Sequence, residues 1–311
     1  MDSLHYKLWD RCTAFVARVC AGRDASHGLA HMRKVTEQAV LLYLMDAPAN
    51  VTHAERAGTL YRIILVGMLH DVADHKYDSD GTLFQQVEAF VEAEAATLLA
   101  LVREDNSAVF SSPLPCSTAA ADDVDAVKRL LLTALDAISY SKENKRGMRW
   151  FVPALSYGSG EASQLFAKEN GTTSSNSWVS VRDYVSDSDK LEAIGEEGLL
   201  RCYEFTCARY RAAAAVAGIG KPATSRPSSD AAATALVERH VEGKLLKDVV
   251  EHFHEKLKRL LPEFMVTKTG RYLGSPRAAE MAALLVEWEA HGPPPVTVYW
   301  RNAASEYVME E

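Results

Sequence analysis

The sequence predicts an all-α protein. Apolar residues recur at helical spacing through most of the chain, and the segments between these stretches are rich in Gly, Pro, Ser and Asn, which end helices. A strand-like alternation of apolar and polar residues occurs only at 296–300, so a sheet is not expected. With 311 residues, 48% of them hydrophobic, the chain can bury a large core, and we expect a single domain over 1–311.

The first part of the chain is expected to form helices over 3–21, 31–44, 53–69, 83–103 and 123–138. Pro48 and Asn50 end the second of these, and Thr52 is a candidate N-cap for the third. From Leu60 to Leu69 the third helix is apolar on nearly all sides, unlike its neighbours, which are amphipathic. We therefore expect it to lie buried at the centre of the fold.

The second part is expected to form helices over 181–210, 231–261 and 276–290. Between the two parts, 150–180 loses helical periodicity and becomes rich in Gly, Ser, Thr and Asn, so it is expected to be a surface insertion. The segment 217–230 has the composition of a loop.

Composition limits the classes of partner and the cellular compartment. The formal charge of −8 argues against binding to a nucleic-acid polymer or a membrane surface, because both attract basic faces. The five cysteines are odd in number and show no close paired spacing, which is typical of reduced thiols. No charged leader and no run of about 18 apolar residues is present. We expect a cytoplasmic protein without a membrane partner, and leave a homodimer open.

The central helix ends in ionisable residues. His70 and Asp71 follow Leu69 directly, and Asp74 lies one turn later. An imidazole and carboxylates at the end of a buried helix are costly unless they are paired or bind a metal. Imidazole suits Zn, Mn, Fe, Co or Ni, and a carboxylate adds a hard oxygen ligand. The sequence therefore predicts a divalent-metal site with nitrogen and oxygen ligands.

Further ligands are available elsewhere in the chain. His31 begins its own helix, so two packed helices can bring His31 and His70 to one point. Asp187 and Asp189 lie at the front of an amphipathic helix whose other face is apolar, so their carboxylates are expected to point into the pocket that this helix lines.

Four segments resemble, in order, the motifs of the HD-domain metal-dependent phosphohydrolases: 26–35, 69–76, 138–142 and 187–195. They carry the H…HD…D pattern of that family as His31, His70-Asp71 and Asp189, and they look most like the bacterial branch that includes nucleotide pyrophosphohydrolases. The resemblance covers about 20–290, including the late segment 267–271 and Arg277. It implies an HD-type helical bundle around one divalent ion, in which 105–122 and the loop at 150–180 are insertions.

The resemblance also implies which residues hold the metal. It favours His31 over His27 as the first ligand and Asp189 over Asp187 as the last, with His70 and Asp71 between them. Two histidines and two aspartates leave positions on the ion open for water and for a phosphate oxygen, as a catalytic site requires. We expect one divalent ion, Mn²⁺ first, with Mg²⁺, Co²⁺, Ni²⁺, Fe²⁺ or Zn²⁺ as alternatives.

Other residues near the motifs are candidates for catalysis and substrate binding. Asp74 is expected to orient or deprotonate the attacking water, and His27 to contact phosphate or act as an acid; the alternatives are a solvated carboxylate and a supporting polar group. Positive charge for a polyphosphate is expected from basic residues, which can alternatively be ordinary surface side chains. These are Lys76, Lys142, Lys190 and Arg33. His252 and His254 point to different sides of a helix, so no second metal site is expected there.

The expected activity is hydrolysis of a nucleoside triphosphate to the monophosphate and pyrophosphate, by attack of a water that the metal activates. A phosphomonoesterase or phosphodiesterase with the same site is an alternative. So is a regulatory module that binds a nucleotide without turnover, because a fold alone does not establish an activity. A helical scaffold with incidental His and Asp residues is the remaining alternative.

Overall fold

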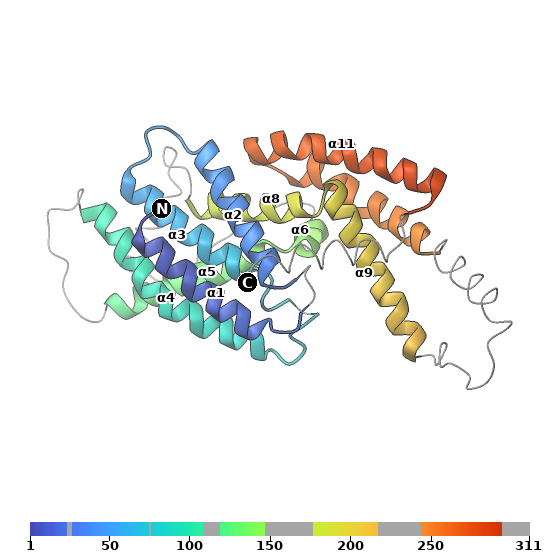
Figure 1. Cartoon of the computed structure of the whole chain (residues 1–311). Helices are drawn as coiled ribbons and strands as arrows, with labels where there is room; N and C mark the ends of the chain where they lie inside the picture. Colours follow the sequence, from blue (N-terminus) through green and yellow to red (C-terminus); the bar gives the residue numbers. More distant parts are fainter. Residues whose placement is uncertain (24–26, 75, 108–118, 147–176, 217–243, 294–311) are drawn as a thin grey trace. The chain divides into compact units, whose positions relative to one another are not determined.

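The computed structural model describes residues 1–23, 27–74, 76–107, 119–146, 177–216 and 244–293 (Figure 1). Within these ranges all regular secondary structure is helical, which confirms the predicted fold class. The helices are α1 (Ser3–Val19), α2 (Leu29–Asp46), α3 (His53–Leu69), α4 (Thr82–Ser107), α5 (Ala119–Ala137), α6 (Tyr140–Arg146), α8 (Ser177–Glu192), α9 (Gly195–Val216) and α11 (Lys268–His291). The candidate strand at 296–300 lies outside the described residues.

The chain forms two compact units. The first comprises Met1–Asp189 together with Met265–Gly270, and the second comprises Lys190–Phe264 and Arg271–Glu311. All four predicted metal ligands belong to the first unit. The single domain expected from the sequence stays a prediction.

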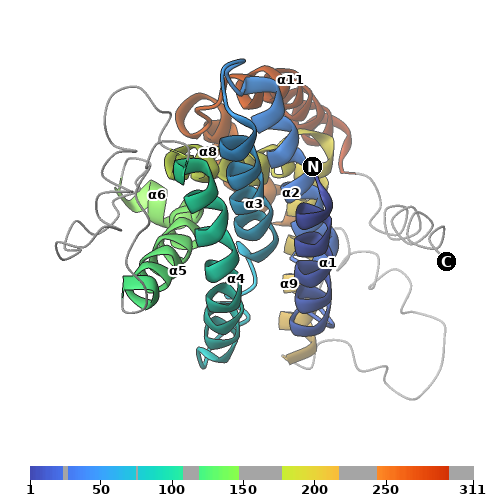
Figure 2. The same ribbon diagram turned by 90° about the vertical axis from the view of Figure 1, so that its left-hand side faces the viewer.

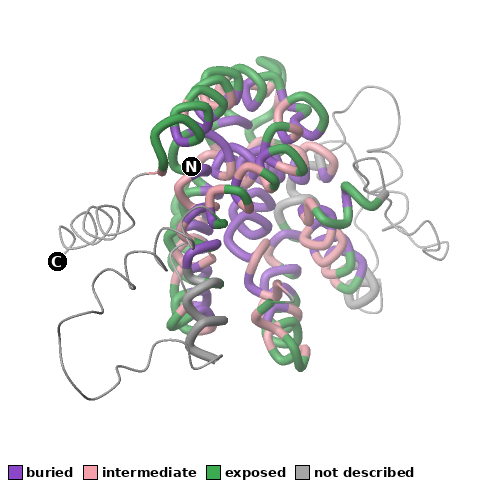
Figure 3. Tube along the Cα trace, turned by 90° about the vertical axis from the view of Figure 1, so that its right-hand side faces the viewer, coloured by how far each residue is buried: buried purple, intermediate pink, exposed green. Residues whose placement is uncertain are grey.

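Helix α3 lies at the centre of the first unit. Every residue from Ala57 to Leu69 is buried, and α3 packs against α1, α2, α4 and α5 (Figures 2 and 3). A capping box fixes its start, since Glu55 N donates to Thr52 Oγ1 at 3.1 Å and Thr52 N donates to Glu55 Oε2 at 2.9 Å. The helix occupies the predicted residues, 53–69, and delivers His70 and Asp71 at the end of an apolar core.

A buried carboxylate joins α1, α3 and α4. Glu94 accepts a hydrogen bond of 2.7 Å at each carboxylate oxygen from Arg11, and another of 2.5 Å from the Tyr61 hydroxyl. Because its charge is paired and hydrogen-bonded, Glu94 can be only 5% exposed without a large desolvation cost. These contacts fix α3 against its neighbours.

Helices α2 and α3 approach closely at Gly67. A Cβ atom at this position would lie 2.6 Å from Thr36 Oγ1 and 3.2 Å from Thr36 Cα. The Thr36 hydroxyl is held in place, since it donates to the carbonyl of Met32 at 2.6 Å. Since α2 carries His31 and α3 carries His70, the absence of a side chain at Gly67 sets how near the two imidazoles come.

We predict that Gly67→Ala destabilises the protein by about 1–3 kcal/mol, the usual cost of an overpacked core, although alanine is the better helix former. Gly58→Ala is the matched control on the same helix, because its Cβ would lie 3.6 Å from Arg62 Nη2, an ordinary contact. Urea unfolding of the metal-free proteins measures both free energies. Equal free energies of unfolding for the two variants would contradict the prediction.

Segment Met265–Gly270 is fastened to α8 and α2 by two aspartates. Asp187 is fully buried, and its Oδ2 accepts from Val266 N at 3.0 Å, Thr267 N at 2.7 Å and Thr267 Oγ1 at 2.7 Å. Asp46 accepts from Thr269 N at 3.1 Å and Thr269 Oγ1 at 2.5 Å. These bonds satisfy backbone N–H groups at the start of α11 and hold the segment against α8.

A cavity of about 290 Å³ lies beside this segment. It is lined by Met45, Asp46, Ser180, Asp183, Tyr184, Val266, Thr267 and Lys268. None of these is a predicted metal ligand, so the cavity is separate from the predicted metal site.

Several predicted elements differ from the structure. The expected helix over 181–210 is two helices, α8 and α9, because Gly195 adopts a φ of +89°, in the left-handed region that favours glycine. Residues 177–180 of the expected insertion belong to α8. Likewise, residues 105–107 of the other expected insertion belong to α4, and 119–122 belong to α5. The remainders of both insertions, 150–176 and 108–118, lie outside the described residues.

The C-terminal helices also differ from their predicted bounds. The helix expected over 231–261 is described from residue 244 and continues as two π-helical segments, Phe253–Leu257 and Leu260–Phe264. The last helix, α11, begins at Lys268 rather than near Pro276, which lies inside it. Asp187 and Asp46 accept hydrogen bonds from the backbone N–H groups of Thr267 and Thr269, and these bonds stabilise a helix start before Pro276.

Two further observations concern the described helices and cysteines. None of the helices described is long and apolar enough to cross a bilayer. The cysteines within the described ranges form no disulfide: Cys12, Cys20, Cys202 and Cys207.

Candidate metal centre

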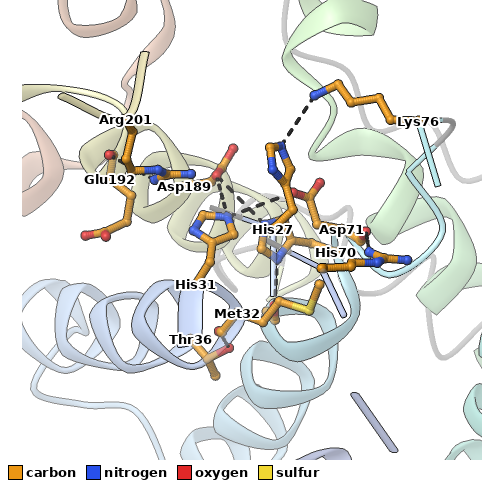
Figure 4. A network of polar contacts seen from close by, with 12 residues as sticks. His27, His31, Met32, Thr36, His70, Asp71, Lys76, Asp189, Glu192 and Arg201 are labelled. Carbon is orange, nitrogen blue, oxygen red and sulfur yellow. Dashed lines mark hydrogen bonds and ion pairs between the residues drawn. The ribbon is translucent and has the colours of Figure 1, made fainter. Parts of the chain in front are cut away.

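Three segments bring His31, His70 and Asp189 together (Figure 4). His31 lies in the first turn of α2, His70 follows the last residue of α3, and Asp189 lies in α8. The Nε2 atoms of His31 and His70 lie 3.4 Å and 3.8 Å from Asp189 Oδ1. One ligand atom from each residue lies within 4.8 Å of the others, so this group can hold a metal ion.

Asp71 lies beside the same group. Its Oδ2 is 3.9 Å from His31 Nε2, and Figure 4 shows its carboxylate directed toward the imidazoles. Asp71 therefore lies next to His31, beside the group formed by His31, His70 and Asp189.

His70 has the hydrogen bonding expected of a metal ligand. Its Nδ1 lies 2.7 Å from the carbonyl oxygen of Gly67, so Nδ1–H donates a hydrogen bond to this oxygen. The other ring nitrogen, Nε2, then carries the lone pair; it is buried and makes no hydrogen bond. A buried polar atom in this state is rare unless it binds something, and metal-bound histidines usually donate their second N–H to such a carbonyl. The residues present thus fit a divalent ion.

The charges of the site also favour a cation. Burial alone would lower the pKa of His70, but Asp71 and Asp189 raise it to about 9. Burial would raise the pKa of Asp189, but the imidazoles of His31 and His70 beside its carboxylate hold that pKa well below its usual range. The two carboxylates therefore stabilise positive charge on the imidazoles, and a divalent ion can supply that charge instead.

Exposure differs between the two kinds of ligand. The side chains of His31 and His70 are 3% and 2% exposed, whereas those of Asp71 and Asp189 are 24% and 33% exposed. The imidazoles form the floor of the centre and the carboxylates its open side. The two carboxylates are therefore the more solvent-accessible side chains of this group.

Two of the predicted phosphate-binding residues lie next to the centre. The ring of His27 has its centroid 6.5 Å from that of His31, and Lys76 Nζ lies 3.4 Å from His27 Nε2 (Figure 4). The ammonium group of Lys76 therefore contacts His27, whose ring neighbours that of His31.

The remaining predicted site residues have other described contacts. Asp74 Oδ1 accepts from the backbone N–H of Lys76 at 2.9 Å, so this carboxylate shapes the turn that carries Lys76. Lys142 forms an ion pair with Asp136, and Arg33 is exposed with its guanidinium 5.9 Å from the centre of the Trp9 ring. Lys190 directly follows Asp189 and is buried. Roles for these four residues stay predictions.

Arg23 contributes to the centre and was not predicted. Its Nη1 donates to the carbonyl of Asp71 at 3.0 Å, and its Nη2 donates to the carbonyl of Val72 at 2.6 Å. A contact with backbone carbonyls leaves no pattern in the sequence. The only available signal was a basic residue beside a glycine, Gly22, which has a φ of +82° here.

Comparisons with known proteins gave structural similarity only. No protein-family model and no curated protein sequence matches the chain. The structure of Bacillus subtilis YpgQ in complex with ADP aligns with a TM-score of 0.45 at 17% identity, over 93% of this chain and 97% of that one. A protein from Lactobacillus plantarum aligns with a TM-score of 0.42 at 18% identity, over 91% and 96%. Both TM-scores lie below 0.5, so neither similarity assigns a function to this chain.

Proposed function

We propose that this protein is an HD-type metal-dependent phosphohydrolase that converts a nucleoside triphosphate to the monophosphate and pyrophosphate. The observation that carries the proposal is the convergence of His31, His70 and Asp189, with Asp71 next to His31 and with the buried Nε2 of His70 making no hydrogen bond. These residues would hold the ion, Mn²⁺ first among the divalent metals. The ion would lower the pKa of a water and neutralise charge on the attacked phosphoryl group.

Substrate binding is assigned to the basic residues beside the centre. Lys76 Nζ lies 3.4 Å from His27 Nε2, and the ring of His27 neighbours that of His31, so both groups are proposed to contact the phosphates. Lys142, Lys190 and Arg33 are proposed to add positive charge for the polyphosphate. This local charge lets a chain with a formal charge of −8 bind an anionic nucleotide. We place this activity in the cytoplasm and on small nucleotides rather than on nucleic-acid polymers.

Asp74 is proposed to accept the proton of the attacking water. Its carboxylate is oriented by the hydrogen bond from Lys76 N, so it is held in one conformation before substrate arrives. The water oxygen forms a bond to the α-phosphorus, and the bond from this phosphorus to the bridging oxygen breaks. Pyrophosphate leaves with the electron pair of the broken bond.

A hydrolysis assay tests the proposal. Each common nucleoside triphosphate is incubated with Mn²⁺, Mg²⁺, Co²⁺ or Ni²⁺, and pyrophosphate and orthophosphate are measured separately. We expect metal-dependent release of pyrophosphate that His70→Ala abolishes. His53→Ala is the matched control, because His53 is an exposed histidine at the other end of α3.

Other outcomes would overturn the assignment in different ways. Orthophosphate as the first product would point to a phosphomonoesterase with the same site. Intact metal binding without turnover of any substrate would point to a nucleotide-binding module instead.

A further inference from the structure

The turn that carries His70 and Asp71 is held from outside by Arg23. This turn follows the last residue of α3, where helix carbonyls lack intrahelical donors. Asp74 N donates to the Asp71 carbonyl at 3.3 Å, and Arg23 donates to the same carbonyl at 3.0 Å and to that of Val72 at 2.6 Å. A cation is also favoured at the C-terminal end of a helix. Arg23 therefore fixes the backbone from which the Asp71 side chain projects.

The same guanidinium group supports the loop that follows. It lies 4.3 Å from the centre of the Tyr77 ring, within the range of a cation–π contact. The Tyr77 ring in turn lies 5.6 Å from the ring of His27, which contacts Lys76. Arg23 thus connects the metal-ligand turn with the loop that carries Asp74 and Lys76.

We propose that Arg23 is a positioning residue: it fixes the His70–Asp71 turn relative to the loop at 74–77, so that the Asp71 carboxylate faces the ion. It acts through backbone carbonyls and an aromatic ring and does not touch substrate. The part that concerns turnover rests on the proposed function, whereas the part that concerns metal geometry does not.

Lysine is not expected to replace Arg23. The planar guanidinium donates to two neighbouring carbonyls and stacks on Tyr77 at the same time, whereas an ammonium is a single point charge on a flexible stem. Arg23→Lys keeps the charge and removes this fixed geometry, so it separates positioning from simple electrostatics.

The test uses the full-length protein with Arg23→Lys, Arg23→Ala and the control Arg18→Ala. Arg18 is an exposed arginine in the last turn of α1 that lies over the Phe15 ring, so its removal changes the net charge equally. Co²⁺ is titrated into each metal-free variant, and the affinity and the visible absorption spectrum of the bound ion are recorded. Thermal unfolding of the metal-free proteins, kcat and KM complete the measurements.

We expect both Arg23 variants to bind Co²⁺ about 10- to 100-fold more weakly, the usual loss when a group supporting a ligand is removed. The cobalt spectrum should change, and kcat should fall while KM changes little. Arg18→Ala should match the wild type. A wild-type spectrum and affinity in Arg23→Lys would overturn the proposal, as would weakened binding fully accounted for by unfolding of the metal-free variant. Wild-type cobalt binding without hydrolysis would instead reject the proposed function, and the spectra would still decide the role of Arg23.

Discussion

Replacing Asp189 by asparagine is expected to abolish turnover and to weaken divalent-metal binding by at least roughly 100-fold. Loss of a group that only supports a ligand already costs about 10- to 100-fold, and Asp189 Oδ1 itself faces both imidazoles, at 3.4 Å from His31 and 3.8 Å from His70. The substitution keeps the shape of the side chain and removes its charge. Calorimetric titration with Mn²⁺ and the pyrophosphate assay measure the two effects.

Asp187→Asn is the matched control, since it makes the same change two residues earlier in α8. The carboxylate of Asp187 accepts hydrogen bonds from Val266 N and Thr267 N and is not a predicted ligand. This variant should therefore keep metal binding and measurable turnover. Full and equal activity in the two variants would refute the assignment of Asp189 as a ligand.

Asp187→Ala is expected to lower the free energy of unfolding by at least about 3 kcal/mol. Its carboxylate accepts from Val266 N, Thr267 N and Thr267 Oγ1, and each buried donor left without an acceptor costs about 1–3 kcal/mol. Chemical denaturation of the metal-free protein measures this loss without interference from ligand binding.

The control for this prediction is Asp10→Ala. Asp10 is an exposed aspartate in α1, so its removal should change the free energy of unfolding by about 0.5 kcal/mol or less. A loss from Asp187→Ala no larger than that from Asp10→Ala would show that the segment 265–270 does not depend on the buried carboxylate.

The sequence predicts the centre of the fold well because the signals there are local. Helix α3 was predicted within its observed bounds, since its apolar residues, its N-cap at Thr52 and the polar residues after Leu69 are all neighbours along the chain. The all-α class follows from the same periodicity.

The elements that were predicted wrongly depend on contacts between distant residues. The start of α11 is set by bonds from Thr267 and Thr269 to Asp187 and Asp46, whereas the sequence offered only Pro276 as a start signal. The break between α8 and α9 depends on the backbone of one residue, Gly195, within an otherwise helical pattern.

The sequence likewise predicts only part of the candidate centre. Residue types and motifs indicate His31, His70, Asp71 and Asp189, but the residues alone do not separate Asp189 from Asp187. In the structure Asp187 accepts hydrogen bonds from Val266 N and Thr267 N, whereas Asp189 lies next to the imidazoles of His31 and His70. Arg23 could not be found from the sequence, because its partners are main-chain carbonyls that any residue would supply.

The predicted ligands come from three separate segments of the chain, so metal binding is expected to depend on folding. In an unfolded chain residues 31, 70 and 189 are far apart, so an ion held by this group would bind the native state selectively. An ion at 100 times its dissociation constant then adds about 2.7 kcal/mol to the free energy of unfolding. Metal supply would therefore regulate how much folded protein persists as well as how fast it works.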